Sequence, residues 1–168
     1  MEFRGIFSFC HQRVFQCKLF AVSIPYFAYG SNMHLEQMAR RCPGARLLHL
    51  VAKRGWRFII NERGYVTAVD DPSARTLGCL WELSEEHWEA LDRYEGVSAG
   101  FYYRVNCQVI RLDSGDSLDA IAYRASSEIP GTPTIEYADT VFDGARQIGL
   151  PEEYLLAIEA WRNGPLPS

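Results

Sequence analysis

The stretch that decides the fold is an apolar run broken abruptly by small and polar residues, Tyr26-Phe27-Ala28-Tyr29-Gly30-Ser31-Asn32-Met33. The run Ile24–Tyr29 is short and rich in aromatic residues, which is typical of a buried strand. Gly30 permits a sharp turn in which the backbone comes close to a ligand. Ser31 and Asn32 are good N-caps for the helical pattern that follows, from Met33 to about Arg41. The segment therefore predicts a strand, a glycine turn and a helix.

A strand that passes through a glycine turn into a helix can bind an anion such as a carboxylate. The first N–H groups of a helix have no acceptor within the helix, and they point outward at this position. An ordinary capped strand–turn–helix without a ligand explains the same residues. The choice between these two interpretations depends on a second segment.

The residues from Ser84 to Gly96 predict an amphipathic helix with a carboxylate on its apolar face. Ser84 can cap the helix and Gly96 can end it. Trp88, Leu91 and Glu95 are spaced by three and four residues, so they share one face. Burying a carboxylate is costly unless it is paired or protonated. Burial and the negative end of the helix dipole both raise a carboxyl pKa, which suits a general acid/base.

Two alternatives to a buried catalytic Glu95 stay open from the sequence. The side chain of a glutamate at the end of a helix can bend into water past Gly96. Asp92 also competes for the role, because it too lies four residues after Trp88.

Three groups of residues fall in the order and at the spacing of a known family, between about residues 25 and 163. They are Tyr26–Asn32; Leu91-Asp92 with Glu95-Gly96-Val97 and Gly100-Phe101-Tyr102; and Pro133 and Tyr137 with Gly144-Ala145, Gly149-Leu150-Pro151 and Tyr154. Together they resemble the γ-glutamylcyclotransferase family, which includes AIG2-like proteins. The resemblance implies a small closed mixed β-barrel flanked by helices, with two helices at its C-terminal end.

The resemblance also implies an activity. The α-amino group of a γ-glutamyl compound would attack its own γ-carbonyl, which yields 5-oxoproline and a free amino acid or amine. Glu95 would be the general acid/base, and no metal or organic cofactor would be needed. The substrate pocket would include Tyr26, Phe27, Ala28, Tyr29, Gly30, Ser31, Asn32 and Tyr137, with Tyr102 and Tyr123 as further hydroxyl donors. For each tyrosine the alternative is core packing with a satisfied hydroxyl.

The rest of the chain mixes strands and helices, which predicts an α+β fold. The expected strands are 45–61, interrupted near Arg54-Gly55, then 65–69, 77–83, and a hairpin of 101–112 and 118–126. Residues Asp70-Asp71-Pro72-Ser73 predict a turn. Thr132-Pro133-Thr134 begins a helix that Gly149 ends, and Pro151 begins another. The first of these helices has an expected apolar face of Ile135, Ala138, Val141, Phe142, Ala145 and Ile148.

Length and composition agree with one compact enzyme domain, and the resemblance implies that its partner is a small-molecule γ-glutamyl substrate. The chain has 168 residues and a net charge of −4 without a basic block, which excludes nucleic acid and acidic membrane surfaces as expected partners. We expect a domain over 25–163, a loosely ordered extension over 1–24 and a tail over 164–168, as a monomer or homodimer. Five scattered cysteines form neither a disulfide framework nor a zinc site, which predicts a reducing compartment, the cytoplasm.

Two functions of other classes remain as alternatives. The barrel could be a non-catalytic module that binds small molecules through the glycine turn. A thiol hydrolase could instead use Cys42 or Cys79, although no histidine stands in a motif-level relation to either cysteine.

Overall fold

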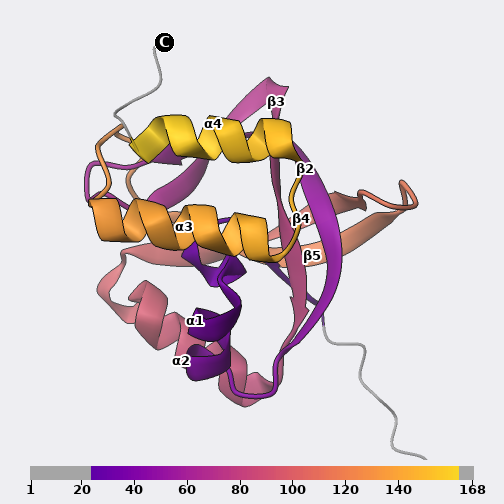
Figure 1. The fold of residues 1–168 in the computed structure, drawn as a ribbon. Helices are drawn as coiled ribbons and strands as arrows, with labels where there is room; N and C mark the ends of the chain where they lie inside the picture. Colours follow the sequence, from indigo (N-terminus) through magenta and orange to yellow (C-terminus); the bar gives the residue numbers. More distant parts are fainter. Residues whose placement is uncertain (1–23, 163–168) are drawn as a thin grey trace, which may run out of the picture.

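The computed structural model describes residues 24–162, and its centre is a closed β-barrel (Figure 1). The strands are β1 (Tyr26–Ala28), β2 (Arg46–Ile60), β3 (Val66–Glu82), β4 (Tyr102–Arg111) and β5 (Ser117–Ala125). They follow one another around the barrel in the order β1-β3-β2-β4-β5. All neighbours are antiparallel except β1 and β5, which pair in parallel with Tyr26 opposite Ile121. The predicted α+β fold with a mixed barrel is confirmed.

Four helices flank the barrel: α1 (Leu35–Arg41), α2 (Glu85–Glu95), α3 (Ile135–Gln147) and α4 (Glu152–Arg162). Two short 3-10 turns, η1 (Ser31–Met33) and η2 (Val97–Ala99), follow β1 and α2. The helices α3 and α4 lie side by side against the barrel, and α1 and α2 lie together at one end of it (Figure 1). In the predicted extension and tail, residues 1–23 and 163–168 lie outside the described residues.

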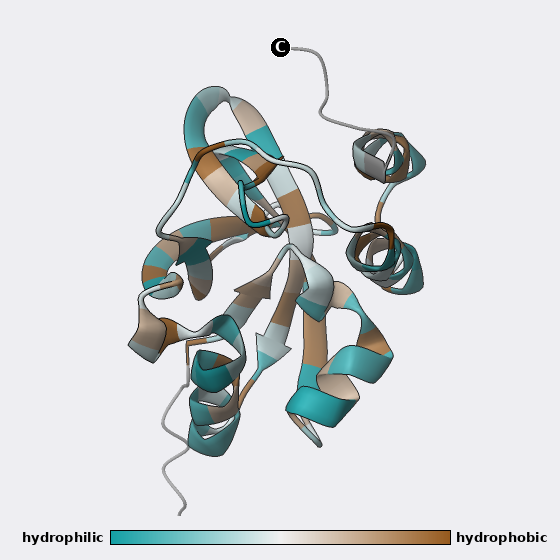
Figure 2. Cartoon of the chain, turned by 90° about the vertical axis from the view of Figure 1, so that its left-hand side faces the viewer, coloured by the Kyte–Doolittle hydropathy of each residue, from teal (hydrophilic) through white to brown (hydrophobic). Residues whose placement is uncertain are grey.

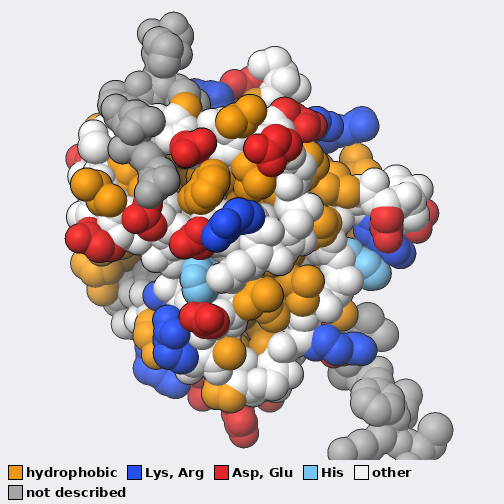
Figure 3. All heavy atoms as spheres, in the orientation of Figure 1, with side chains coloured by type: hydrophobic (Ala, Val, Ile, Leu, Met, Phe, Trp, Pro, Cys, Tyr) orange, Lys and Arg blue, Asp and Glu red, His pale blue; other side chains and the backbone are white. Residues whose placement is uncertain are grey.

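The helices turn their apolar sides toward the barrel and their hydrophilic sides outward (Figure 2). In α3 the predicted apolar face is buried at Ala138, Val141, Ala145 and Ile148. Ile135 is an exception, because at the first position of α3 it is 70% exposed, and its placement on that face was wrong. The outer face of α3 and α4 carries acidic and basic side chains among apolar ones (Figure 3).

The turn predicted at Asp70–Ser73 was wrong. The long strand β3 passes through these residues, and the pairing with β2 shifts there instead. Arg54 pairs with Arg75 whereas Trp56 pairs with Asp70, so β3 carries extra residues that form a bulge. Residues that favour turns also fit a bulge, because the extra residues of a bulge are not paired with the neighbouring strand.

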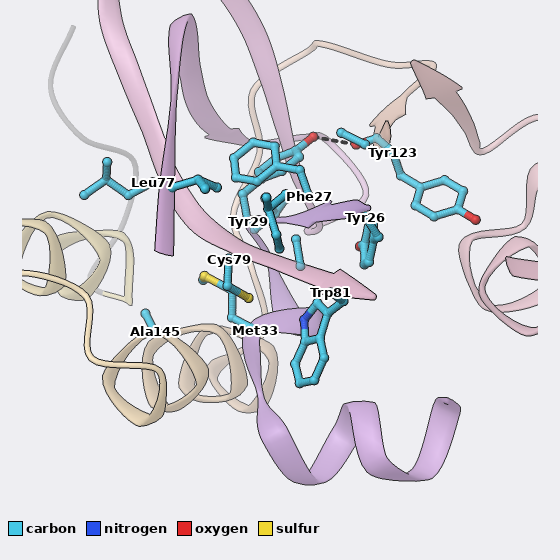
Figure 4. Packing of buried hydrophobic residues seen from close by; sticks show 14 of the residues in the cluster. Tyr26, Phe27, Tyr29, Met33, Leu77, Cys79, Trp81, Tyr123 and Ala145 are labelled. Carbon is cyan, nitrogen blue, oxygen red and sulfur yellow. Dashed lines mark hydrogen bonds between the residues drawn. The ribbon is translucent and has the colours of Figure 1, made fainter. Parts of the chain in front are cut away.

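The barrel interior and the α3 side of the sheet form one apolar core (Figure 4). Phe27, Cys79, Leu80 and Met33 are fully buried in it. The side chains of β1 and β3 meet there, and β1 thereby holds the segment that follows it at the barrel end. Within residues 24–162, no helix is both long and apolar enough to span a bilayer.

Candidate active site

A small pocket of about 40 Å³ lies where β1, η1 and the end of α2 meet the barrel. Every predicted site residue lines it except Phe27 and Ala28, which are fully buried elsewhere in the core. The lining residues are Tyr26, Tyr29, Gly30, Ser31, Asn32, Val66, Glu95, Tyr102, Tyr123 and Tyr137. The fold thus brings the glycine turn, the end of the second predicted helix and tyrosines from later segments to one place.

Glu95 is the acidic residue of this pocket. It is the last residue of α2, and Gly96 ends the helix in the left-handed conformation with φ of 65°. The Glu95 side chain is only 16% exposed, so it does not bend out into bulk water. Burial raises the pKa of its carboxyl above the ordinary value of 4.5, and the nearby Arg41 guanidinium and the Asn32 amide oppose this effect.

Asn32 connects Glu95 to the rest of the pocket. Its Nδ2 donates to Glu95 Oε1 at 3.0 Å and to the Tyr26 hydroxyl at 2.9 Å. Its Oδ1 accepts a hydrogen bond from Arg41 Nη1 at 2.7 Å, and that same nitrogen lies 4.0 Å from Glu95 Oε1. The Trp81 indole donates to the main-chain oxygen of Asn32 at 3.1 Å. Asn32 is therefore 3% exposed with its side chain fully engaged.

The prediction that Ser31 or Asn32 caps the first helix was wrong. Both residues belong to η1, and α1 begins later, with His34 Nδ1 accepting a hydrogen bond from the Gln37 N–H. Asn32 cannot cap a helix because its side chain is bonded to Glu95 and Arg41. The sequence signal for a cap was ambiguous, because the polar side chains of Ser and Asn can either cap a helix or form the hydrogen bonds of a site.

Gly30 fits a closely packed position at the turn. Its φ is −124°, which any residue can adopt, but a Cβ there would lie 3.1 Å from Val66 Cβ. The hydrogen bonds of η1 use the N–H groups of Met33 and His34 as donors. The N–H groups of Gly30 and Ser31 lie outside this bonding at the pocket wall, where they can serve as donors to an anion.

Three pocket tyrosines donate their hydroxyl protons to the protein. Tyr29 donates to the carbonyl of Tyr123 at 2.6 Å (Figure 4), and Tyr102 donates to the carbonyl of Val66 at 2.7 Å. Tyr123 donates to Asp92 Oδ1 at 2.6 Å. These three side chains line the pocket, but their hydroxyl groups are bonded to other protein groups. This agrees with the alternative stated above, in which a tyrosine packs in the core with a satisfied hydroxyl.

Tyr26 and Tyr137 differ from the other three, because their hydroxyl oxygens act as acceptors. Tyr26 accepts from Asn32 Nδ2, and Tyr137 accepts from the Val66 N–H at 3.1 Å. Accepting these bonds leaves each hydroxyl able to donate its own proton. Burial raises the pKa of Tyr137 to about 12 and the pKa of Tyr26 well above its ordinary value, so both stay protonated at neutral pH. Tyr137 also interacts with the Ser31 side chain through a hydrogen bond that lowers its pKa.

Asp92, the competing carboxylate, does not line the pocket. It accepts the Tyr123 hydroxyl, and the Arg104 guanidinium binds it through two hydrogen bonds of 2.9 and 2.7 Å. Arg104 also lies over the Trp88 ring, with 4.6 Å from its guanidinium carbon to the ring centroid. This arrangement makes Asp92 an anchor for Tyr123 from outside the pocket.

The geometry gives no support to a thiol nucleophile. Cys42 and Cys79 are buried and do not line the pocket, and burial raises the pKa of Cys42 to about 11. His87 lies near Cys42 but bonds to Ser84 and Pro43 through its two ring nitrogens. Among the residues that the structure describes, no three His, Cys, Asp or Glu side chains are grouped as metal ligands.

A wider cleft of about 480 Å³ adjoins the pocket and shares Ser31, Glu95, Tyr102 and Tyr137 with it. Its remaining lining residues are Gln37, Arg41, Arg63, Tyr65, Tyr94, Phe101 and Thr140. The sequence did not predict Arg41, Arg63 or Val66 as site residues. Arg63 lies between two predicted extended segments, and the usual placement of binding residues on such loops could have indicated it.

Comparisons with known proteins agree with this fold. Residues 75–158 match the AIG2-like family. The human γ-glutamylcyclotransferase is 25% identical over 148 residues, which cover 82% of this chain and 78% of the human protein. The mouse γ-glutamylcyclotransferase is 26% identical over 145 residues, 80% and 77% of the two chains. A solved structure of a γ-glutamyl cyclotransferase superposes with a TM-score of 0.77 at 23% identity, covering 86% of this chain and 89% of that one.

Proposed function

The chain belongs to the AIG2-like family, and from this premise we propose that it is a γ-glutamylcyclotransferase that converts γ-glutamyl amino acids to 5-oxoproline and the free amino acid. The observation that carries the proposal is the placement of Glu95. Its carboxyl lies in a small pocket, largely removed from water, and the Gly30 turn lines the same pocket. Such a carboxyl can exchange protons with an amine that is bound there.

The reaction begins with removal of a proton. The α-amino group of the substrate is protonated at neutral pH, since its pKa is about 8. The carboxylate of Glu95 takes this proton, and the free amine nitrogen attacks the γ-carbonyl carbon. The carbonyl electrons move to oxygen, which forms a tetrahedral intermediate. In this intermediate the attacking nitrogen carries a positive charge and one proton more than the nitrogen of the product. When the intermediate collapses, the bond to the departing nitrogen breaks and Glu95 gives its proton to that nitrogen. The Glu95 carboxylate then takes the extra proton from the ring nitrogen and passes it to the released amine, which leaves as an ammonium ion, so that atoms and charge balance.

The pocket also supplies position and charge stabilisation. Cyclisation requires the amine nitrogen and the γ-carbonyl carbon to approach within about 3–3.5 Å. The N–H groups of Gly30 and Ser31 and the hydroxyl groups of Tyr26 and Tyr137 are donors for the α-carboxylate or for the developing oxyanion. Donors fixed in a small pocket do not have to reorganise during the reaction, which favours the transition state.

We propose that this enzyme needs no cofactor and works in the cytoplasm. General acid/base catalysis by one carboxyl and fixed hydrogen-bond donors is sufficient for the reaction. The free cysteines Cys42, Cys79 and Cys107 fit a reducing compartment.

The decisive experiment replaces the carboxyl with an amide. Glu95→Gln keeps the size and an acceptor for Asn32 but cannot exchange a proton, so we expect turnover to fall by roughly a thousandfold or more. Release of 5-oxoproline from γ-glutamyl dipeptides is measured by mass spectrometry. Glu89→Gln is the matched control, since Glu89 is an exposed residue of the same helix.

Two results would contradict the proposal in different ways. Near-normal turnover in Glu95→Gln would move the acid/base role to another group. Binding of γ-glutamyl ligands by the wild-type protein without 5-oxoproline release would identify a non-catalytic binding module instead.

A further inference from the structure

The cleft that adjoins the pocket is where the departing part of a substrate would lie. The two cavities share four lining residues, among them Glu95, so they adjoin at this residue. The γ-glutamyl group, which must reach Glu95 and the Gly30 turn, occupies the inner pocket in the proposed function. The group attached to the γ-carbonyl then extends past Glu95 into the cleft of about 480 Å³.

Arg63 is a cation held at this cleft without an acidic partner. It lies on the loop between β2 and β3, partly buried, and its Nη2 donates to the carbonyl of Phe101 at 3.0 Å. Its guanidinium carbon lies 4.5 Å from the Phe101 ring centroid and 5.5 Å from that of Tyr102. Within residues 24–162, no ion pair joins Arg63 to a carboxylate.

Other partly buried arginines are neutralised by the protein itself. Arg111 is paired with Asp113 and Asp116, and Arg124 is paired with Asp70 and Glu128. A guanidinium has five N–H donors, and the ring contacts and one carbonyl fix Arg63 while leaving donors for a ligand. Such a planar fork can bind a carboxylate through two parallel hydrogen bonds.

The other cleft residues agree with a ligand that combines an anionic and an apolar part. The charged residues of the cleft are Arg41, Arg63 and Glu95, and Arg41 is already engaged by Asn32 and Glu95. Tyr65, Tyr94 and Phe101 also line the cleft, and they are 48%, 58% and 50% exposed. Exposed aromatic rings gathered around one cleft are typical of a binding surface.

We propose that Arg63 is a specificity-determining residue that binds the carboxylate of the leaving amino acid, so that γ-glutamyl dipeptides with an apolar second residue are preferred over γ-glutamyl amines. This inference rests on the proposed cyclotransferase function. An amine leaving group has no carboxylate, so the guanidinium N–H groups that do not bond to Phe101 would have only water as their partner.

A matched pair of substrates isolates the carboxylate. γ-Glutamyl-phenylalanine and γ-glutamyl-phenethylamine have the same apolar part and differ only in that group. We expect wild-type kcat/KM to favour the dipeptide by roughly 10- to 100-fold, the range of a hydrogen-bonded charge pair. In Arg63→Gln this preference should disappear through a higher KM for the dipeptide, while kcat/KM for the amine falls much less.

Three further variants separate recognition from structure. Arg63→Lys keeps the charge without the planar fork, and an intermediate preference is expected. Arg75→Gln removes an exposed arginine far along β3 and should leave the preference unchanged. Binding of both compounds to Glu95→Gln and to Glu95→Gln/Arg63→Gln, followed by NMR titration, measures recognition without turnover.

The outcomes distinguish this inference from the proposed function. If wild type releases no 5-oxoproline from either compound, the proposed function fails, and the titration alone decides whether Arg63 recognises the carboxylate. An equal loss for both compounds in Arg63→Gln, or an undiminished preference for the dipeptide, would overturn the role of Arg63. Melting temperatures of all variants identify any that lose activity by unfolding.

Discussion

At the scale of single residues, the carboxyl of Glu95 is the group whose environment matters most. Burial raises its pKa, and Arg41 is the larger of the two influences that lower it, ahead of Asn32. The Arg41 side chain is 22% exposed, so water screens its charge only in part. The three residues together set the pH range in which Glu95 can accept a proton.

The first prediction concerns the pH dependence of catalysis. Only the ionised carboxylate can act as a base, so kcat/KM should rise with pH through the pKa of Glu95, at a midpoint above 4.5. Arg41→Gln removes the cation that favours the ionised form, and the midpoint should move to higher pH. Profiles of kcat/KM against pH test this.

Arg40→Gln is the matched control, since Arg40 is the exposed neighbour on α1. Its midpoint should equal that of wild type. An unchanged or lower midpoint in Arg41→Gln would contradict the charge effect.

At the scale of elements, the site turn is held between the barrel and α3. Gly144 makes the contact possible, because a Cβ there would lie 2.5 Å from the main-chain nitrogen of His34 and 2.9 Å from the carbonyl carbon of Met33. The helix therefore packs directly on the backbone of η1 and the residue after it. A main-chain obstacle of this kind cannot move aside as a flexible side chain can.

The second prediction tests this packing. Alanine is favoured over glycine within helices by about 1 kcal/mol. Gly144→Ala should nevertheless lower the free energy of unfolding by roughly 1–3 kcal/mol, because the added methyl group overpacks the contact. Displacement of η1 should also raise KM. Urea unfolding and steady-state kinetics provide the two measurements.

Arg146→Ala, at an exposed position of the same helix, serves as the control and should change stability by no more than roughly 0.5 kcal/mol. A more stable Gly144→Ala protein would show that helix propensity outweighs the contact.

Local patterns predict elements well where one signal dominates. Helix α2 begins after Ser84 and ends at Gly96 as expected, because cap, apolar spacing and stop signal agree. Residues 70–73 show the opposite case, since turn-forming residues fit both a reversal and a bulge, and only the partner strand decides. His34 was not expected to cap α1, because Ser31 and Asn32 were predicted as the capping residues.

At the scale of the whole molecule, the buried carboxyl affects folding stability. A carboxyl whose pKa is raised by folding binds its proton more tightly in the folded state than in the unfolded one. Its contribution is therefore most favourable below the unfolded pKa of about 4.3, and it is lost as pH rises through the folded value. The ionised form costs stability at neutral pH.

The third prediction follows from this sign. Glu95→Gln cannot ionise, so its melting temperature at pH 7 should exceed that of wild type, and the difference should shrink as the pH falls toward 4. Differential scanning calorimetry across this pH range provides the measurement. A variant that is less stable than wild type at pH 7 would show that the charged form is well compensated by Arg41 and Asn32.

The arrangement of distant segments was the hardest part to predict from sequence. The family resemblance indicated a closed barrel, but strand periodicity alone contains no information on the parallel pairing of Tyr26 with Ile121. Most predicted pocket residues do line one cavity, since β1 and α2 carry their own local signals. Arg41 and Val66 reach the site only through tertiary packing, which no local pattern encodes, whereas the position of Arg63 on a loop was a weak signal.

The closure of the barrel through the three-residue strand β1 also fixes the register in which β1 pairs with its neighbours. A strand with only one neighbour can slip, but β1 is bonded to β3 on one side and to β5 on the other. A slip by one residue would turn Phe27 to the opposite face of the sheet and would carry the Gly30 bend away from Glu95. Correct pairing of β1 with both neighbours therefore also fixes the position of the Gly30 and Ser31 N–H groups relative to the Glu95 carboxyl.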